Sequence, residues 1–336
     1  MTAWTKELVQ KHAQVAAAIE LYTIPFYTTV MTSIKDENCY AYKILHGILI
    51  EEMMHLQLAA NLCLALDTTP NFQFPAYGTD IPFLNPGTVL NAKMGPLNAD
   101  TLNTMLAIET PEGTLGANDP TPNGNTTPTF PYSSIGEMYH ALICGIQSVG
   151  ASQFSWTTIN QQARWIQQGY PQIICNISDA KEAVTAIEEQ GEGRRMSTTI
   201  QKPYKPSYFP VEPKYQMDNR APAGAHGGPY QGIMLKEYSH FGRLLYIQQK
   251  GLPAAYSGQN NPKYPTNNAL QGKFMAMMGS LNPLWTLNPG SLMSPEQLWR
   301  TAIDTMRDTA KLARQCWQDG VIPTWFYLNL DDIIIK

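Results

Sequence analysis

The sequence predicts an all-α protein built around a four-helix bundle, with long inserted loops and additional helices toward its C-terminus. Three observations support this fold class. Apolar residues recur at spacings of three and four over several long segments. No alternating strand pattern and no internal repeat interrupts them. Finally, glutamate and histidine residues stand inside the apolar helical segments, where a bundle would have to bury them.

Composition excludes several classes of protein. The chain has 336 residues, 43% of them hydrophobic and 15% charged, which permits one large or two ordinary domains. A net charge of -4 and the absence of a long Lys/Arg run argue against nucleic-acid binding. No apolar run approaches the ~18 residues needed to cross a membrane. Five scattered cysteines form neither a disulfide framework nor a CxxC motif, so a cytoplasmic location is expected.

The first predicted helix covers residues 4–34 and contributes one acidic residue to the interior. Glu20 lies among apolar positions such as Ile19. Pro25 also falls inside the pattern, and its missing N–H leaves the Leu21 carbonyl without a helical partner. We therefore expect a long helix that is kinked or loosened near Leu21 and that carries Glu20 inward.

The second predicted helix begins at Asp36 and Glu37 and continues to Leu66. Glu52 and His55 are three residues apart in it, so both side chains leave the same apolar face. A carboxylate and an imidazole facing a core are costly to bury unless they are paired or bound to a cation. Glu-x-x-His on a bundle helix is half of a dimetal carboxylate site.

A second Glu-x-x-His motif supplies the other half. Glu237 and His240 lie in a predicted helix over residues 232–249. A helix from Asp179 to about Gly191 supplies a further glutamate. The glutamate of this helix that faces inward is either Glu188 or Glu192. The order Glu, Glu-x-x-His, Glu, Glu-x-x-His over four helices matches the dimetal bundle pattern and suits two Fe or Mn ions.

Other residues of the same types have simpler interpretations. Glu137 and His140 form a third pair, at the start of a helix predicted over 135–168, where Glu137 favours the helix dipole. We interpret this pair as supporting or structural, with ligation as the alternative. Two glutamates of IETPEG are equally ambiguous: Glu109 and Glu112. Two histidines are expected at the surface or in loops: His12 and His226.

The remaining chain is divided between loops and shorter helices. Pro/Gly-rich or polar loops are expected at 67–97, 111–134 and 202–230, and loops of this length often line functional sites. Helices are expected at 99–109, 269–281 and 294–319. We divide the chain into a metal-binding bundle at 1–250 and a C-terminal helical extension at 251–336, packed on the same domain.

Several short sequence segments resemble the ferritin-like domain of the iminophenyl-pyruvate dimer synthase family. This family includes imine-dimerising enzymes of the violacein and rebeccamycin pathways. The segments fall between about residues 16 and 250: AIELYTIPFY, EEMMHLQLAANL, IETPE, SIGEMYHAL, EQGEG and KEYSHFGRL. The resemblance implies a ferritin-like bundle and favours Glu192 over Glu188. The implied metal ligands are Glu20, Glu52, His55, Glu192, Glu237 and His240. Enzymes that define the family are much longer, so imine coupling is not transferred.

These observations favour a non-haem dimetal oxidase or oxygenase with two Fe ions per chain, Mn being the other candidate metal. The expected reactants are dioxygen and a small substrate, which the resemblance makes an amino-acid-derived aromatic compound of specialised metabolism. The main alternative is a non-catalytic ferritin-like metal-binding or iron-handling protein. A metal-free structural bundle and a single-metal hydrolase are further alternatives. The sequence is also compatible with a partner enzyme in the same pathway and with assembly into a homo-oligomer.

Overall fold

The computed structural model describes residues 3–70, 72, 77, 83–84, 92–109, 128, 131–132, 134–164, 172–191, 239–286 and 293–326. Within these residues the fold is all-α, with eight α-helices and one short 3-10 helix. β-Structure in the same residues is limited to isolated bridges, for example between Ile34 and Ala255. The predicted fold class is therefore observed.

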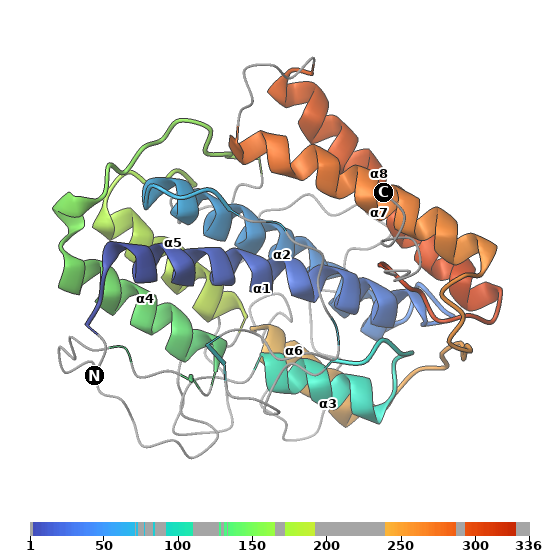
Figure 1. The fold of residues 1–336 in the computed structure, drawn as a ribbon. Helices are drawn as coiled ribbons and strands as arrows, with labels where there is room; N and C mark the ends of the chain where they lie inside the picture. The colour runs from blue at the N-terminus through green and yellow to red at the C-terminus, as the bar shows by residue number, and fades with distance from the viewer. Residues whose placement is uncertain are drawn as a thin grey trace.

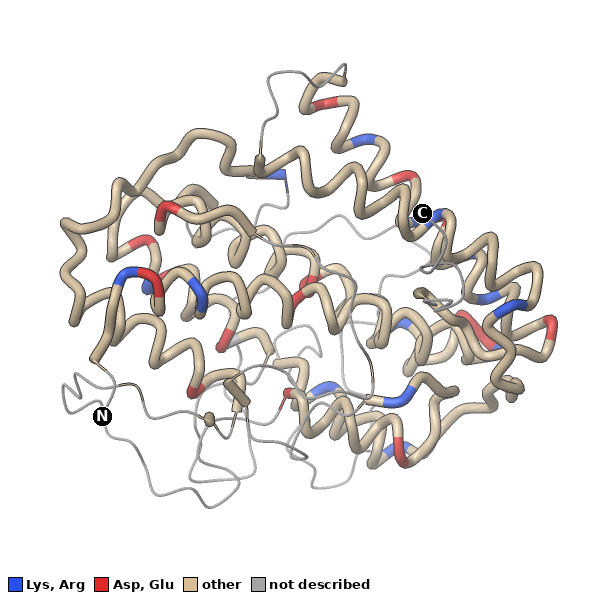
Figure 2. The backbone as a smooth tube through the Cα atoms, viewed as in Figure 1, with Lys and Arg blue, Asp and Glu red and all other residues tan. Residues whose placement is uncertain are grey.

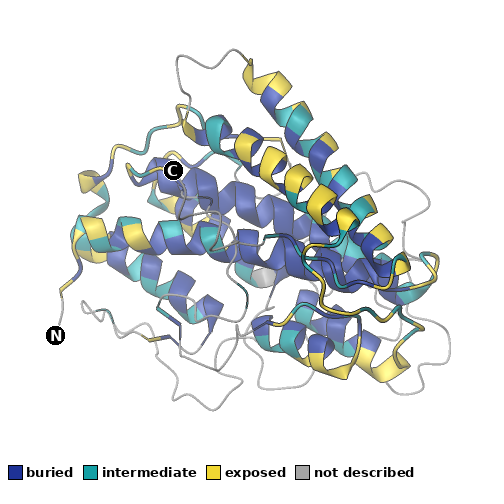
Figure 3. Cartoon of the chain, turned by 45° about the vertical axis from the view of Figure 1, so that its right-hand side comes forward, coloured by how far each residue is buried: buried dark blue, intermediate teal, exposed yellow. Residues whose placement is uncertain are grey.

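Two long neighbouring helices form the centre of the molecule, α1 (Lys6–Thr32) and α2 (Tyr40–Ala65) (Figure 1). Thr5 begins α1 by accepting a hydrogen bond from the backbone of Leu8. α1 continues through Pro25 as one helix, in agreement with the predicted segment. Both helices are almost entirely buried over their central turns (Figure 3), so polar residues placed there must find partners inside the protein.

The second helix starts later than predicted. The carboxylate of Asp36 accepts the backbone N–H of Asn38, which makes a turn before the helix rather than its first residues. Cys39 has extended backbone angles and α2 begins at Tyr40. This short connection returns the chain beside α1.

Four shorter helices surround this pair: α3 (Ala99–Ile108), α4 (Ile135–Val149), α5 (Ile177–Gln190) and α6 (His240–Lys250). Figure 1 shows α4 and α5 along one part of the central pair and α3 with α6 along another, and the packing contacts agree. Each begins with a side chain that accepts a backbone N–H of its first turn: Asn98, Ser134, Asn176 and Ser239.

Two predicted helices have different limits in the structure. The helix predicted over 135–168 ends at Val149, because Gly150 adopts a φ of +96° that stops an α-helix. The helix predicted over 232–249 is observed from His240, because Ser239 has extended angles and caps its start. Residues 232–238 lie outside the described residues. Asn176 caps α5, so this helix begins at Ile177 rather than at the predicted Asp179.

The C-terminal helices α7 (Pro265–Thr286) and α8 (Pro295–Gln318) pack against each other, and α8 packs on α1. α7 is longer than the predicted 269–281, whereas α8 agrees with 294–319. Figure 2 shows charged residues of both signs along α8, and Figure 3 shows that this charged side is exposed. Its other side binds the end of α1, where Trp317 Nε1 donates to Thr29 O at 3.0 Å.

Further bonds hold the same junction together. The Arg314 guanidinium donates to the carbonyl oxygens of Ile34, at 2.9 Å, and Lys35, at 2.8 Å, just beyond the end of α1. Trp325 Nε1 donates to Thr29 Oγ1 at 2.7 Å. These bonds satisfy polar groups that would otherwise be left unpaired in a partly buried place.

α2 is long and apolar enough to cross a membrane by length and composition alone. However, 94% of its most apolar window is buried inside the protein. That burial is what a central helix of a bundle requires, so the composition of α2 has a sufficient explanation in its packing.

The contact between α4 and the N-terminal segment leads to a stability prediction. A Cβ at Gly145 would lie 2.6 Å from the Trp4 ring, closer than real contacts allow. We expect Gly145→Ala to lower the free energy of unfolding by about 1–3 kcal/mol through overpacking. Gly272→Ala, on an exposed position of α7 with open space around it, should instead raise it by roughly 0.5–1 kcal/mol. Urea unfolding followed by circular dichroism measures both, and equal effects would contradict this packing.

Candidate metal centre

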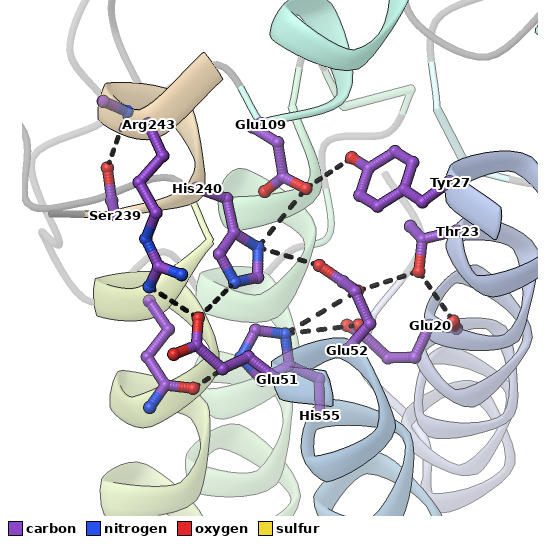
Figure 4. Close-up of polar contacts among 12 residues, drawn as sticks. Glu20, Thr23, Tyr27, Glu51, Glu52, His55, Glu109, Ser239, His240 and Arg243 are labelled. Atoms are coloured by element: carbon purple, nitrogen blue, oxygen red, sulfur yellow. Dashed lines mark hydrogen bonds and ion pairs between the residues drawn. The ribbon is translucent and has the colours of Figure 1, made fainter. Parts of the chain in front are cut away.

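The bundle brings together a cluster of buried acidic and histidine side chains from four elements (Figure 4). α1 supplies Glu20, α2 supplies Glu52 and His55, and α6 supplies His240. Glu109 joins them from the C-terminal end of α3. None of the five is more than 4% exposed. Four of these residues were candidates from the sequence, and Glu109 was an ambiguous one.

Glu52 is at the centre of the cluster, and its two carboxylate oxygens face different histidines. Oε1 lies 2.8 Å from Nδ1 of His240. Oε2 lies 3.8 Å from Nδ1 of His55 and accepts a hydrogen bond from Thr23 Oγ1 at 2.8 Å. Glu52 thus brings together the three residues, itself, His55 and His240, that could hold a metal ion.

One further carboxylate stands beside each histidine. Glu20 Oε2 is 3.7 Å from Nδ1 of His55, and Glu109 Oε1 is 3.5 Å from Nδ1 of His240. The cluster therefore divides into two halves that share Glu52. The half around His55 contains Glu20, and the half around His240 contains Glu109.

These distances and atoms suit divalent cations. Two atoms about 2.1 Å from one ion lie about 3.0 Å apart at a right angle and further apart at wider angles. The separations of 3.5, 3.7 and 3.8 Å fall within that range, and the 2.8 Å between Glu52 Oε1 and His240 Nδ1 is slightly shorter. Glu52, His55 and His240 each offer a ligand atom, all within 4.8 Å of one another. Carboxylate and imidazole donors suit Fe and Mn. The residues present therefore fit a metal centre.

A small cavity of about 30 Å³ opens onto this cluster. Its polar wall is formed by residues of the cluster and their neighbours: Glu20, Thr23, Glu52, His55, Glu109, Tyr139 and Glu188. Its apolar wall contains four isoleucines: Ile19, Ile108, Ile135 and Ile187. A space of this size holds about one water molecule, so it admits only small ligands.

Each histidine is also held by a contact at Nε2, the ring nitrogen on the side away from Glu52. Nε2 of His55 lies 2.8 Å from Oε1 of Gln190, and Nε2 of His240 lies 2.9 Å from Oε2 of Glu51. Because both partners are oxygen acceptors, each Nε2 carries the proton, and Nδ1 can coordinate once it has lost its own proton. Arg243 binds the same Glu51 oxygen at 2.6 Å. The sequence singled out none of these three supporting partners.

Two tyrosines donate hydrogen bonds to the flanking carboxylates. Tyr139, from α4, donates to Glu20 Oε1 at 2.5 Å, and Tyr27, from α1, donates to Glu109 Oε1. Neither tyrosine was a candidate from the sequence. Burial, together with the negative carboxylate each one touches, raises the pKa of both hydroxyls well above the ordinary value, so both keep their protons.

The two carboxylates nearest His55 differ in protonation when no metal is bound. Burial raises the pKa of Glu20 to about 8, an effect that the positive charge of His55 opposes only in part. Burial also disfavours the charged form of Glu52, but the two imidazoles that face its oxygens, those of His240 and His55, outweigh burial and lower its pKa below the usual range. Glu52 is therefore the ionised centre of the cluster, and Glu20 keeps its proton at neutral pH.

Both histidines are pushed toward the charged form by the same carboxylates. Burial lowers the pKa of an imidazole, yet Glu52 and Glu20 together raise that of His55. Glu109, Glu51 and Glu52 raise that of His240 well above its ordinary value. The metal-free cluster consequently holds protons that cations would displace.

The other candidates from the sequence have separate outcomes. Glu188 is half-buried and lines the cavity, whereas Glu192 and Glu237 lie outside the described residues, as do Glu112 and His226. Glu137 and His140 are half-buried on α4 and are not among the described residues that line the cavity.

His12 was wrongly expected at the surface. It is fully buried and stacks on Phe83 with ring centroids 4.2 Å apart. Its Nδ1 lies 2.7 Å from the Leu8 carbonyl oxygen, and its Nε2 lies 3.1 Å from the Tyr132 hydroxyl. Both ring nitrogens are thus satisfied inside the core, which allows a histidine to occupy an apolar position.

Comparison with known proteins agrees with this architecture. Residues 13–211 match a family described as Ferritin-like. A solved structure, described as a ferritin-like protein from Caulobacter vibrioides, matches with a TM-score of 0.69 and 23% identity. The match covers 97% of this chain and 100% of that chain. No curated protein matches the sequence. The predicted ferritin-like, all-α fold is confirmed.

The raised pKa of Glu20 gives a prediction for the metal-free protein. Between about pH 4.5 and 8 the folded state keeps a proton that the unfolded state has released, so the free energy of unfolding falls as pH rises. Glu20→Gln cannot ionise and should remove about 2–4 kcal/mol of that fall. Urea unfolding in the presence of a chelator measures this at several pH values. Glu296→Gln, at an exposed ion pair with Arg164, is the control. Parallel curves for wild type and Glu20→Gln would contradict this assignment.

Proposed function

Because its match to the family spans residues 13–211, the chain belongs to the ferritin-like family, and we propose that it is a non-haem dimetal oxidase or oxygenase. Iron is the proposed metal, at two ions per chain, with manganese as the other candidate. The proposed substrate is a small organic molecule. The proposal also includes a cytoplasmic location and no nucleic-acid or membrane partner, both of which rest on composition.

The observation that carries the proposal is the position of Glu52 between two histidines. Its oxygens face His55 and His240, while Glu20 and Glu109 stand on either side. We assign one metal position to Glu20, Glu52 and His55. We assign the other to Glu52, Glu109 and His240. Glu109, an ambiguous candidate from the sequence, is thereby added to the proposed ligands.

Three further glutamates remain candidates for completing the two positions. Glu188 lines the cavity beside Glu20. Glu192 and Glu237 come from the resemblance to the iminophenyl-pyruvate dimer synthases. Carboxylate ligands beyond Glu20, Glu52 and Glu109 would raise the negative charge of the centre and favour two cations over one.

Reduced iron held by these residues would supply electrons to dioxygen, and the substrate or an added reductant would return the iron to the reduced state between turnovers. The protein's own residues control the surroundings of that chemistry. The isoleucine wall of the cavity limits entry of water. Tyr139 and Tyr27 orient Glu20 and Glu109 and hold protons next to them. Thr23 fixes one oxygen of Glu52.

The substrate class rests on the resemblance. An amino-acid-derived aromatic compound of specialised metabolism is proposed, with a partner enzyme that would supply an unstable precursor. The cavity of about 30 Å³ is smaller than an aromatic ring, so such a substrate would have to displace part of the isoleucine wall. Dioxygen fits the cavity without this displacement.

The small cavity favours a second function, that of a non-catalytic ferritin-like metal-binding or iron-handling protein. A cavity that admits about one water molecule, beside ligands that are at most 4% exposed, is suited to holding metal without an organic substrate. Oxidation of many substrate molecules per chain would exclude this alternative. Oxidation limited to the bound iron, with a large assembly on size-exclusion chromatography, would favour it.

The first prediction of the proposal concerns stoichiometry. Anaerobic titration of the metal-stripped protein with Fe(II) should reach two ions per chain, because Glu52 offers one oxygen to each half of the cluster. Glu52→Ala should weaken the binding of both ions by at least tenfold. Glu296→Gln, which changes an exposed ion pair, is the matched control and should bind as wild type does. One ion per chain in wild type would replace the dimetal centre with a mononuclear one.

The second prediction concerns oxygen-dependent activity. Addition of oxygen to the iron-loaded protein should produce a transient visible or near-ultraviolet absorption band and support oxidation of an aromatic substrate. His240→Ala removes a ligand from one half and should abolish that turnover, because both ions are required. Retention of oxygen-dependent oxidation by Glu52→Ala and His240→Ala, with correct folding, would rule the proposal out.

A further inference from the structure

The two histidines of the cluster are supported by partners of different charge. Behind His55, the neutral amide of Gln190 accepts the Nε2 hydrogen at 2.8 Å. Behind His240, the carboxylate of Glu51 accepts it at 2.9 Å. Both partners are buried, at 0% and 4% exposure respectively, so water does not equalise them. Figure 4 shows both rings joined to Glu52, and the ring of His240 joined also to Glu51.

Arg243 fixes Glu51 in this supporting position. Its guanidinium is 1% exposed and donates to Oε2 of Glu51 at 2.6 Å, which is the oxygen that also binds His240. A buried guanidinium requires an acidic partner, so the ion pair holds the Glu51 carboxylate in place and aims its Oε2 at the imidazole.

This difference has a chemical consequence for metal binding. A carboxylate that accepts the outer N–H of an imidazole draws the proton away from the ring and makes the opposite nitrogen a stronger electron donor. A neutral amide orients the ring but donates less electron density. Nδ1 of His240 should therefore bind a cation more strongly than Nδ1 of His55 does, although the two imidazoles are chemically identical.

We propose that Glu51, held by Arg243, and Gln190 are positioning residues that make the two metal positions unequal. The position at His240 fills first and with the higher affinity, and the position at His55 fills second. This inference rests on the proposed dimetal centre and adds to it an order of loading that neither the sequence motifs nor the fold specifies.

A purely structural role for these residues would have a different signature. If Glu51 and Arg243 only stabilised the packing of α6 on α2, their replacement would change the free energy of unfolding without separating the two affinities. Gln190→Glu is the sharper variant, because it keeps the side-chain length and gives His55 the kind of partner that His240 already has. It leaves the Glu51–Arg243 pair intact.

The experiment is an anaerobic titration of the metal-stripped full chain with Co(II), followed by its visible absorption and by calorimetry at about pH 8, where protons compete less for the ring nitrogens. Wild type should bind two ions in two steps of different affinity. His240→Asn should remove the tighter step, and His55→Asn the weaker one. Glu296→Gln serves as the control away from the cluster.

The supporting residues are then exchanged. Gln190→Glu should tighten the weaker step about tenfold and bring the two affinities together. The double variant Glu51→Gln with Arg243→Met removes both charges at once and should weaken the tighter step about 10–100-fold. Replacing both partners avoids leaving either charge buried alone. Should the double variant fail to fold by circular dichroism, Gln190→Glu decides the result by itself.

The outcomes separate this inference from the proposed function. Two steps that Gln190→Glu leaves unchanged, or a tighter step that His55→Asn removes instead, would overturn the unequal loading while keeping the dimetal centre. Two equal steps in wild type would overturn it as well. Absence of Co(II) binding, or a single ion per chain, would overturn the dimetal centre itself and this inference with it.

Discussion

The structure depends on placing one ionised carboxylate, Glu52, in the middle of an apolar bundle. An isolated buried charge is too costly to persist, so its oxygens must be satisfied by cations or hydrogen bonds. The imidazoles of His55 and His240 and the hydroxyl of Thr23 supply those contacts. They come from three helices, α1, α2 and α6, so the same interaction that stabilises Glu52 also fixes the relative positions of these helices.

Charge is arranged in layers around that carboxylate. The inner layer contains the groups that could hold cations, and the next contains groups that hold those ligands in place. Tyr139 donates to Glu20, Gln190 accepts from His55, and Glu51 accepts from His240. Each is buried, so the energies of these contacts are not reduced by water. The layers therefore orient the ligands before any metal arrives, which lowers the cost of forming the centre.

The periodic features of the fold could be predicted from the sequence. Apolar spacing gave the central helices because their burial requires a continuous apolar surface, and α1 and α8 agree closely with the predicted segments. Errors arose where a local conformation interrupts a periodic pattern. Gly150 ends α4 near the middle of the predicted 135–168 helix, and Ser239 caps α6 at His240. His12 was misplaced because its satisfying partners, Tyr132 among them, are remote in the sequence.

The sequence by itself determined the all-α class and the inward-facing positions of Glu20, Glu52 and His55, because spacing along one or two helices fixes which side chains share a face. Only the tertiary structure decided that Glu109 completes the cluster and that Gln190 and Glu51 support the histidines. Gln190 is 135 residues from His55 and Glu51 is 189 residues from His240. No helical period connects such positions. Their contact exists only because packing around the central pair brings separate helix ends to the same buried carboxylate.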